Sequence, residues 1–147
     1  DRTADIFVEG WAFGHAVVDR PDAVADVASA LVTEAARVTR RGGSILLIET
    51  LGTNAEEPVA PDPALAEFYR ELEECHGFHR TVISTDYRFS SIEEATELMG
   101  FFFGSEMGQS VSARLERTKK RAVGDVPDGL IIPEFTGIWS RRAGSEE

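Results

Sequence analysis

The 147-residue chain has only one cysteine, no long apolar run and no excess of basic residues. Cys75 has no second cysteine with which to form an internal disulfide, and this favours a reducing, cytoplasmic compartment. Apolar runs such as Ile45–Ile48 fall far short of the roughly 18 residues that a membrane-spanning helix needs. The formal net charge of -11 argues against a nucleic-acid binder, because such proteins need a cationic surface. We therefore expect neither a membrane nor a nucleic acid as partner.

Two further absences concern cofactors. The sequence contains no G-x-G-x-x-G motif, the glycine-rich turn typical of dinucleotide sites. Cys75, His76 and His79 are of the residue types that bind zinc, but their spacing does not match a structural zinc pair and no fourth ligand is evident, so we expect no metal site. The chain also starts at Asp1 without a methionine, and we expect it to be a fragment.

The composition, with 42% hydrophobic and 28% charged residues, is typical of a soluble globular protein. We expect a single domain that spans 1–147. Segments with strand and helix patterns alternate along it. We expect strands over 5–9, 44–50, 80–89 and 130–139, separated by helices over 24–38, 65–75 and 92–102. This alternation predicts an α/β fold with a largely parallel sheet.

Local signals predict how these segments begin and end. A loop is expected after Gly10, and Gly42-Gly43 would supply a left-handed stop to the first helix. Pro133 cannot donate a ladder hydrogen bond, which indicates a bulge or an edge in the last strand, after a turn over 124–129. Phe102 is expected to face inward, and the Phe101–Phe103 run to lie mostly in the core.

Three segments carry a family resemblance when taken together. The segment 5–15 reads DIFVEGWAFGH, the segment 34–50 reads EAARVTRRGGSILLIET, and the segment 131–139 reads IIPEFTGIW. They resemble, in order, the fourth strand, the helix, turn and fifth strand, and the seventh strand of class I S-adenosylmethionine-dependent methyltransferases of the small-molecule branch. In that family the seventh strand is antiparallel and inserts between the fifth and the sixth, which here would be 80–89.

The resemblance implies a partial Rossmann-like methyltransferase fold, from the fourth to the seventh strand with the intervening helices. The N-terminal portion that binds the cofactor, with its glycine-rich turn and its ribose-binding acid, is absent from the sequence. The expected cofactor of the intact domain is S-adenosylmethionine, and the expected reaction is methyl transfer to a small-molecule acceptor. We expect the isolated fragment to be inactive.

Ligands of open α/β sheets bind at the carboxyl ends of the strands. The residues that leave the first two strands there are Glu9, Gly10, Trp11, Phe13, His15, Glu49 and Thr50. By resemblance, Gly10 and Trp11 would lie beside the methionine part of the cofactor, where an aromatic face can hold a sulfonium cation. The alternative is that Trp11 and Phe13 belong to the core.

The acceptor side of this site is assigned to the remaining residues. His15 could act as a general base toward a substrate hydroxyl, or be a solvated loop residue. Glu9, the second candidate catalytic residue, could orient substrate or cap a neighbouring helix. Phe13, Glu49 and Thr50 are the predicted substrate-binding residues.

Two other functions remain open. The first is a non-catalytic Rossmann-like relic or interaction module, which would form a homo-oligomer through the exposed apolar edge of the 5–9 strand. The second is a nicotinamide-dependent oxidoreductase, because the same alternation serves dinucleotide folds. The antiparallel final strand and the lack of a Y-x-x-x-K pair count against this last class.

Overall fold

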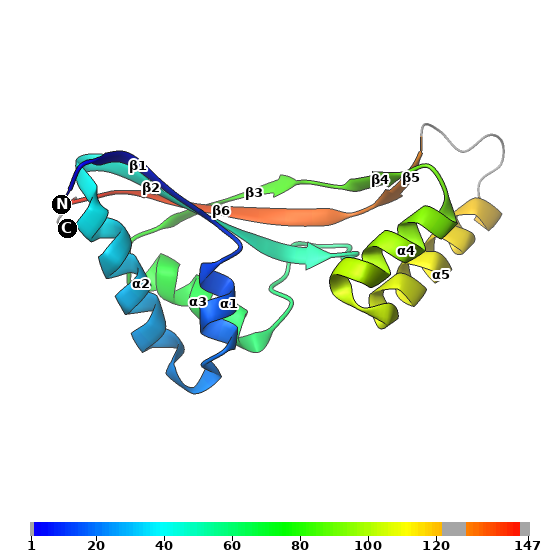
Figure 1. Cartoon of the computed structure of the whole chain (residues 1–147), viewed down its shortest axis with the longest axis horizontal. Coiled ribbons are helices and arrows are strands. Elements are labelled where there is room, and N and C mark those ends of the chain that lie inside the picture. Colours follow the sequence, from blue (N-terminus) through cyan, green and yellow to red (C-terminus); the bar gives the residue numbers. More distant parts are fainter. Residues whose placement is uncertain (1, 122–128, 145–147) are drawn as a thin grey trace. The chain divides into compact units, whose positions relative to one another are not determined.

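The computed structural model describes residues 2–121 and 129–144, which fall into two compact units (Figure 1). The first unit comprises Asp1–Ser84 and Phe135–Glu147, and the second comprises Thr85–Glu134. Every candidate site residue predicted from the sequence belongs to the first unit. None of the helices in these described ranges has the length and apolar character needed to cross a bilayer.

The first unit contains a four-stranded sheet in the order β1-β2-β6-β3. Its strands are β1 (Ala4–Gly10), β2 (Thr39–Thr53), β3 (His79–Ser84) and β6 (Glu134–Arg142). β1 and β2 are parallel, whereas β6 is antiparallel to β3. The residue after β6, Ala143, exchanges backbone hydrogen bonds with Gly42 and Gly43 near the start of β2, so β6 also runs against β2. The α/β class is thus confirmed, with the last strand antiparallel and inserted between its neighbours as expected.

The helices of this unit lie along one face of the sheet (Figure 1). They are α1 (Phe13–Val18), α2 (Val24–Val38) and α3 (Pro63–Glu74), with a short 3-10 turn at Pro21–Ala23. α2 buries Val24, Val27, Ala28, Val32 and Ala35, whose spacing places them on one side of the helix. The Asp62 carboxylate begins α3 by accepting from the backbone N–H of Ala64, and Pro63 occupies the first helical turn.

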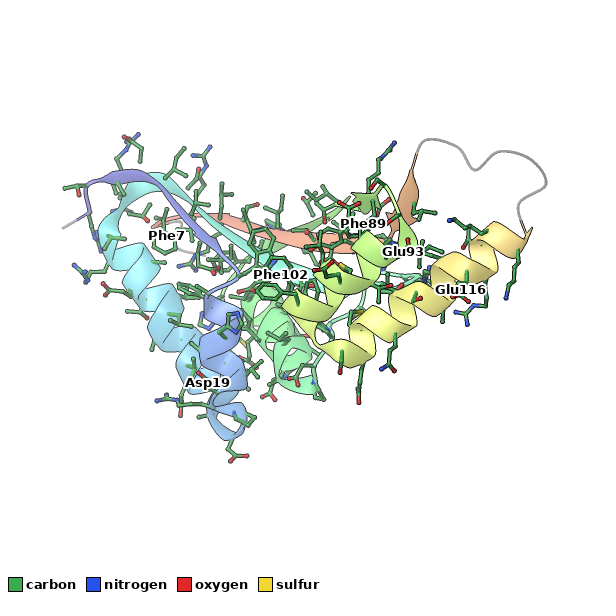
Figure 2. All side chains as sticks on the ribbon, turned by 45° about the vertical axis from the view of Figure 1, so that its right-hand side comes forward. Phe7, Asp19, Phe89, Glu93, Phe102 and Glu116 are labelled. Atoms are coloured by element: carbon green, nitrogen blue, oxygen red, sulfur yellow. The ribbon has the colours of Figure 1, made fainter. Side chains whose placement is uncertain are left out.

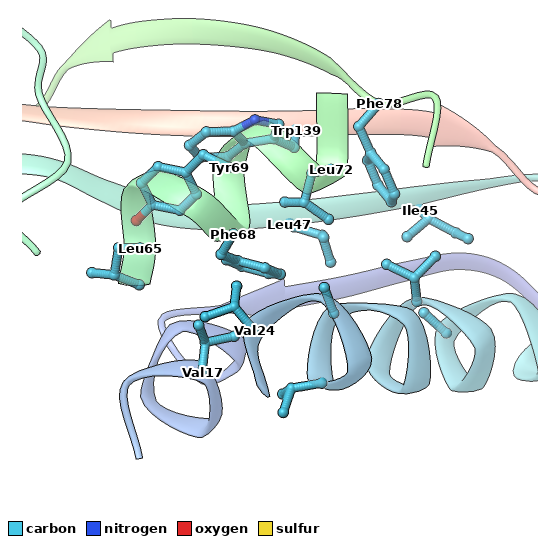
Figure 3. Packing of buried hydrophobic residues seen from close by; sticks show 14 of the residues in the cluster. Val17, Val24, Ile45, Leu47, Leu65, Phe68, Tyr69, Leu72, Phe78 and Trp139 are labelled. Carbon is cyan, nitrogen blue, oxygen red and sulfur yellow. The ribbon is translucent and has the colours of Figure 1, made fainter. Parts of the chain in front are cut away.

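The core lies between these helices and the sheet (Figure 3). Ile45 and Leu47 of β2 are fully buried there, together with Phe68 and Leu72 of α3. Trp139 of β6 stacks on Tyr69 with ring centroids 4.3 Å apart, and its indole N–H donates to Glu73 at 2.9 Å. α3 is therefore held to the sheet by apolar contacts and by a directed hydrogen bond.

None of the helices described in the first unit lies over the opposite face of its sheet (Figure 1). Ile6 and Val8 of the edge strand β1 expose 59% and 57% of their surface, and Leu46 and Ile48 of β2 are only half-buried. A continuous apolar run such as that of β2 is typical of a central strand covered on both faces. β2 is central, but the helices of the first unit cover only one face among its described residues.

The second unit has its own small core. The antiparallel strands β4 (Tyr87–Phe89) and β5 (Leu130–Ile132) pack with α4 (Ile92–Phe103) and α5 (Ser105–Arg121). The Ser91 hydroxyl caps the start of α4 by accepting from the N–H of Glu94. Gly108 lets the two helices approach, because a Cβ there would lie 2.7 Å from the backbone oxygen of Thr96.

Two predicted boundary signals were wrong. The loop expected after Gly10 is short, because Phe13–Val18 forms α1. The first helix ends at Val38, the last residue of its predicted range, so Gly42-Gly43 does not supply its stop. Gly42 does adopt a left-handed φ of 76°, but it does so inside β2, where the register with β1 jumps from Ala4 opposite Thr39 to Ile6 opposite Ser44.

The single strand expected over 80–89 is divided into β3 and β4, which belong to different sheets. The division falls where Thr85 donates its N–H to the Glu134 carbonyl and Asp86 accepts from the Glu134 N–H. Pro133 divides the last strand in the same way, into β5 and β6. Of the turn expected over 124–129, only Gly129 lies within the described residues.

The aromatic run at the end of α4 is exposed, not buried. Phe101 exposes 79% of its surface, and Phe102, labelled in Figure 2, exposes 70%. The inward side of α4 is formed by Ala95 and Met99 instead. The expectation that Phe102 faces inward was wrong because the helix has apolar residues on more than one side, and its burial depends on what packs against it.

Candidate functional site

Two carboxylates meet where the parallel strands β1 and β2 end. Glu9 is the penultimate residue of β1, and Glu49 lies near the end of β2, two residues beyond Leu47, which pairs with Glu9. Both side chains are buried, and Glu49 exposes only 2% of its surface. The structure therefore brings together two residues that the sequence placed 40 positions apart.

The two carboxylates hold the first turn of α1. Oε1 of Glu9 accepts from the backbone N–H groups of Ala12 and Phe13, the second at 2.9 Å. Oε1 of Glu49 accepts from the N–H of Gly14 at 2.7 Å. Negative groups are favourable at this end of a helix, because the first backbone N–H groups have no partner within the helix. Capping, one of the two roles foreseen for Glu9, is what the structure displays.

The buried environment of Glu49 suppresses its ionisation. Burial and, second, the charge of Glu9 raise the pKa of Glu49 to about 7, against the lowering effect of the Gly14 N–H. Oε2 of Glu9 is also buried and accepts no hydrogen bond from the described residues. Two adjacent carboxylates away from water cannot both carry a charge cheaply, so near neutral pH this site holds or releases a proton.

Tyr69 of α3 completes the site from the other side. Its hydroxyl donates to the backbone carbonyl of Thr50 at 2.9 Å and thereby fixes the chain immediately after Glu49. Burial, followed by the charges of Glu49 and Glu9, raises the pKa of Tyr69, so the hydroxyl keeps its proton. The sequence placed Tyr69 only on the buried side of a helix. The available signal was that a buried tyrosine hydroxyl needs a partner.

Gly14 is the second residue that the sequence did not single out. A Cβ at this position would lie 2.8 Å from Oε2 of Glu49 and 3.0 Å from Cδ2 of Leu65. Only a glycine lets the α1 backbone come this close to the Glu49 carboxylate without displacing it. The close contact could not be read from the local sequence, because its partner is 35 residues away.

The other predicted residues surround the pair with different exposures. Trp11 has a left-handed φ of 55° and exposes 52% of its surface, while its N–H donates to the Ile48 carbonyl. Phe13 is half-buried against Phe7, with ring centroids 6.1 Å apart. His15 is exposed on α1. Of the two rings for which a core position was the alternative, Phe13 packs against the core and Trp11 does not.

Thr50 contributes through its hydroxyl and its backbone. Oγ1 accepts from the N–H of Gly52 at 3.2 Å, and the carbonyl accepts from Tyr69. Both contacts shape the chain as it leaves β2. Within the described residues, no three His, Cys, Asp or Glu side chains are grouped in a way that could hold a metal ion.

Comparisons with known proteins add little to what the geometry of the site shows. No protein-family model matches the chain, and no curated protein matches it. Among solved structures, it is similar to a candidate methyltransferase from Bacillus halodurans C-125, with 17% identity and a TM-score of 0.48. That similarity covers 97% of this chain and 71% of the other. At such a TM-score the functional assignment has to be based on the strand order and side chains of this chain itself.

Proposed function

We propose that the chain is the acceptor-side part of an S-adenosylmethionine-dependent methyltransferase domain of the small-molecule branch. The observation that carries this proposal is the strand order β1-β2-β6-β3, with β1 and β2 parallel and an antiparallel β6 inserted before β3. This is the arrangement implied by the family resemblance for the fourth to seventh strands. The candidate residues then lie at the sheet edge where ligands of α/β proteins bind.

The residues at the end of β1 fit the sulfonium end of the cofactor. Trp11 follows Glu9 by two residues in the chain and exposes 52% of its surface, and an exposed aromatic face suits a cation. A Cβ at Gly10 would meet nothing within 4 Å, so the backbone there is open to a ligand. S-adenosylmethionine supplies an electrophilic methyl group on a positively charged sulfur. The chain has no glycine-rich turn for the rest of the cofactor, and we expect it to be inactive alone.

On the acceptor side, the chain supplies groups that accept and position a proton. Glu49, whose pKa is raised to about 7, can take a proton from an acceptor near neutral pH, which is the range where a general base is most effective. Glu9 fixes the start of α1, and α1 carries Phe13 and His15. His15, exposed on that helix, is the alternative base for an acceptor hydroxyl.

Ligand titration followed by tryptophan fluorescence tests this proposal. The full-length protein is titrated with S-adenosylmethionine and, separately, with NAD. We expect S-adenosylmethionine to change the emission of Trp11, and Trp11→Phe, which keeps the buried Trp139, to remove that change. A response to NAD alone would favour an oxidoreductase, and no response to either ligand would exclude the proposal.

The exposed edge supports a second candidate, a non-catalytic module that self-associates. β1 is an edge strand whose Ile6 and Val8 expose more than half of their surface, and such edges pair with other chains. Sedimentation of the chain tests this function. We expect a dimer that Val8→Lys dissociates and that Val82→Lys, on the opposite edge strand, leaves intact. A clean monomer that melts cooperatively would exclude self-association.

A further inference from the structure

A cavity of about 320 Å³ lies in the first unit beside the end of β2. One wall is the segment after β2, where the N–H of Val59 donates to the Leu51 carbonyl at 2.8 Å and so holds the segment in place. Residues of α3 and Arg80 of β3 also line the cavity. This volume is at the lower end of the range for ligand pockets, roughly 300 to 1,000 Å³, and suits a small molecule.

One stripe of α3 lines the cavity. Ala66, Tyr69, Arg70, Glu73 and Glu74 all contribute, and their spacing of three and four residues places them on a single side of the helix. The lining as a whole combines apolar residues, among them Leu51, Val59 and Ala66, with the charged residues Arg70, Glu73, Glu74 and Arg80.

The two arginines are held loosely. Arg80 Nε lies 3.4 Å from Oε1 of Glu73, an oxygen that already accepts the Trp139 indole N–H at 2.9 Å. Arg80 pairs with Trp139 across the β3–β6 ladder, which places both side chains on the helix side of the sheet. Arg70 lies 3.3 Å from Glu71 and from Glu74, and Glu74 is exposed. Exposed ion pairs of this kind add little stability and are easily exchanged.

We propose that this cavity binds a small carboxylate with an apolar body. The guanidinium groups of Arg70 and Arg80 would take the carboxylate, and Leu51, Val59 and Ala66 would contact the apolar part. Guanidinium presents several donors in a fork that matches a carboxylate, so each arginine can keep its glutamate and still bind the ligand. An ammonium ligand would have to compete with the two arginines, because Glu73 accepts from Trp139 and pairs with Arg80, and Glu74 pairs with Arg70.

That the bound carboxylate is the methyl acceptor rests on the proposed function. That the cavity binds a carboxylate does not depend on it. Leu51 in the cavity wall directly follows Thr50, and Tyr69 contributes both to the wall and to the hydrogen bond with Thr50. The cavity therefore adjoins the end of β2 where the candidate site lies. An acceptor anchored here would place its carboxylate away from the Glu9 and Glu49 pair.

Titration of the isotope-labelled chain followed by NMR tests the proposal. The probes are hexanoate, hexylammonium and 1-hexanol, which share an apolar body and differ in the head group. We expect hexanoate to shift the Val59 amide and the Trp139 indole signals saturably, and to bind on the order of tenfold more tightly than 1-hexanol. Tighter binding of hexylammonium, equal binding of 1-hexanol, or the absence of saturation would overturn the assignment.

Substitutions locate the binding. Arg70→Gln and Arg80→Gln should each weaken hexanoate on the order of fivefold, while Arg117→Gln, an equal loss of charge on the exposed side of α5, should leave it unchanged. Ala66→Leu should block the cavity without any change of charge. Wild-type affinity in all three cavity variants would refute the site. These titrations contain no methyl donor. If the protein binds hexanoate but does not bind S-adenosylmethionine, only the methyl-transfer proposal is refuted and the carboxylate site stands.

Discussion

Neutralising Glu49 tests the buried carboxylate pair. Because the pKa of Glu49 is raised from 4.5 to about 7, the folded chain binds this proton more tightly than the unfolded chain does. The associated stability is fully present below about pH 4.5 and is lost as pH rises through about 7. At about 1.4 kcal/mol per pKa unit, the loss is about 3 kcal/mol of unfolding free energy, an upper value for a coupled pair.

Glu49→Gln should remove this pH dependence. A glutamine side-chain oxygen can still accept from the Gly14 N–H, but it does not ionise, so the variant should exceed the wild type in stability at pH 8 and approach it at pH 5. The assay is urea unfolding between pH 5 and pH 8, followed by tryptophan fluorescence, because Trp11 and Trp139 both belong to the first unit. Glu67→Gln on the exposed side of α3 is the matched control. A variant that kept the wild-type slope would refute the reasoning.

Three further substitutions test single contacts by thermal or urea unfolding. Gly14→Ala should cost about 1–3 kcal/mol, because its Cβ meets Glu49 and Leu65, whereas Gly10→Ala, with open space around it, should cost much less. Tyr69→Phe should cost about 1–2 kcal/mol through the lost hydrogen bond to Thr50, and an unchanged stability would contradict that role. Gly108→Ala should destabilise the second unit by about 1–3 kcal/mol, while Gly100→Ala, in ordinary contact, should be tolerated.

The parts of the fold that follow from local pattern were predictable. The apolar spacing of α2 is set within a few turns of helix, and the run at Ile45–Ile48 suits only a central strand. Glu9 and Glu49 were both placed at the candidate site, because the carboxyl ends of adjacent parallel strands share one edge of the sheet. These features follow from local residue spacing or from a rule that holds for any parallel sheet, so the sequence alone was enough to predict them.

The features that depend on distant partners were not predictable. α1 has only six residues, and its first N–H groups are satisfied by Glu9 and by Glu49, the second from 35 residues away. A segment this short has too few local hydrogen bonds to be recognised as a helix from its own sequence. The exposure of Phe101 and Phe102 has the same origin, because an apolar helix surface is buried only if another element packs on it.

The choice of two acids at this position argues for a functional role. The three N–H groups at the start of α1 could be satisfied by neutral oxygens, such as a serine hydroxyl or an amide carbonyl. The chain instead buries two carboxylates, leaves Oε2 of Glu9 without a hydrogen bond from the described residues, and loses stability above neutral pH. Such a cost, concentrated where α/β proteins bind ligands, is typical of a group retained for proton transfer or for binding a cation. Glu49→Gln should gain stability above neutral pH in either case, and a loss of activity in the full-length protein would identify Glu49 as a proton-accepting residue.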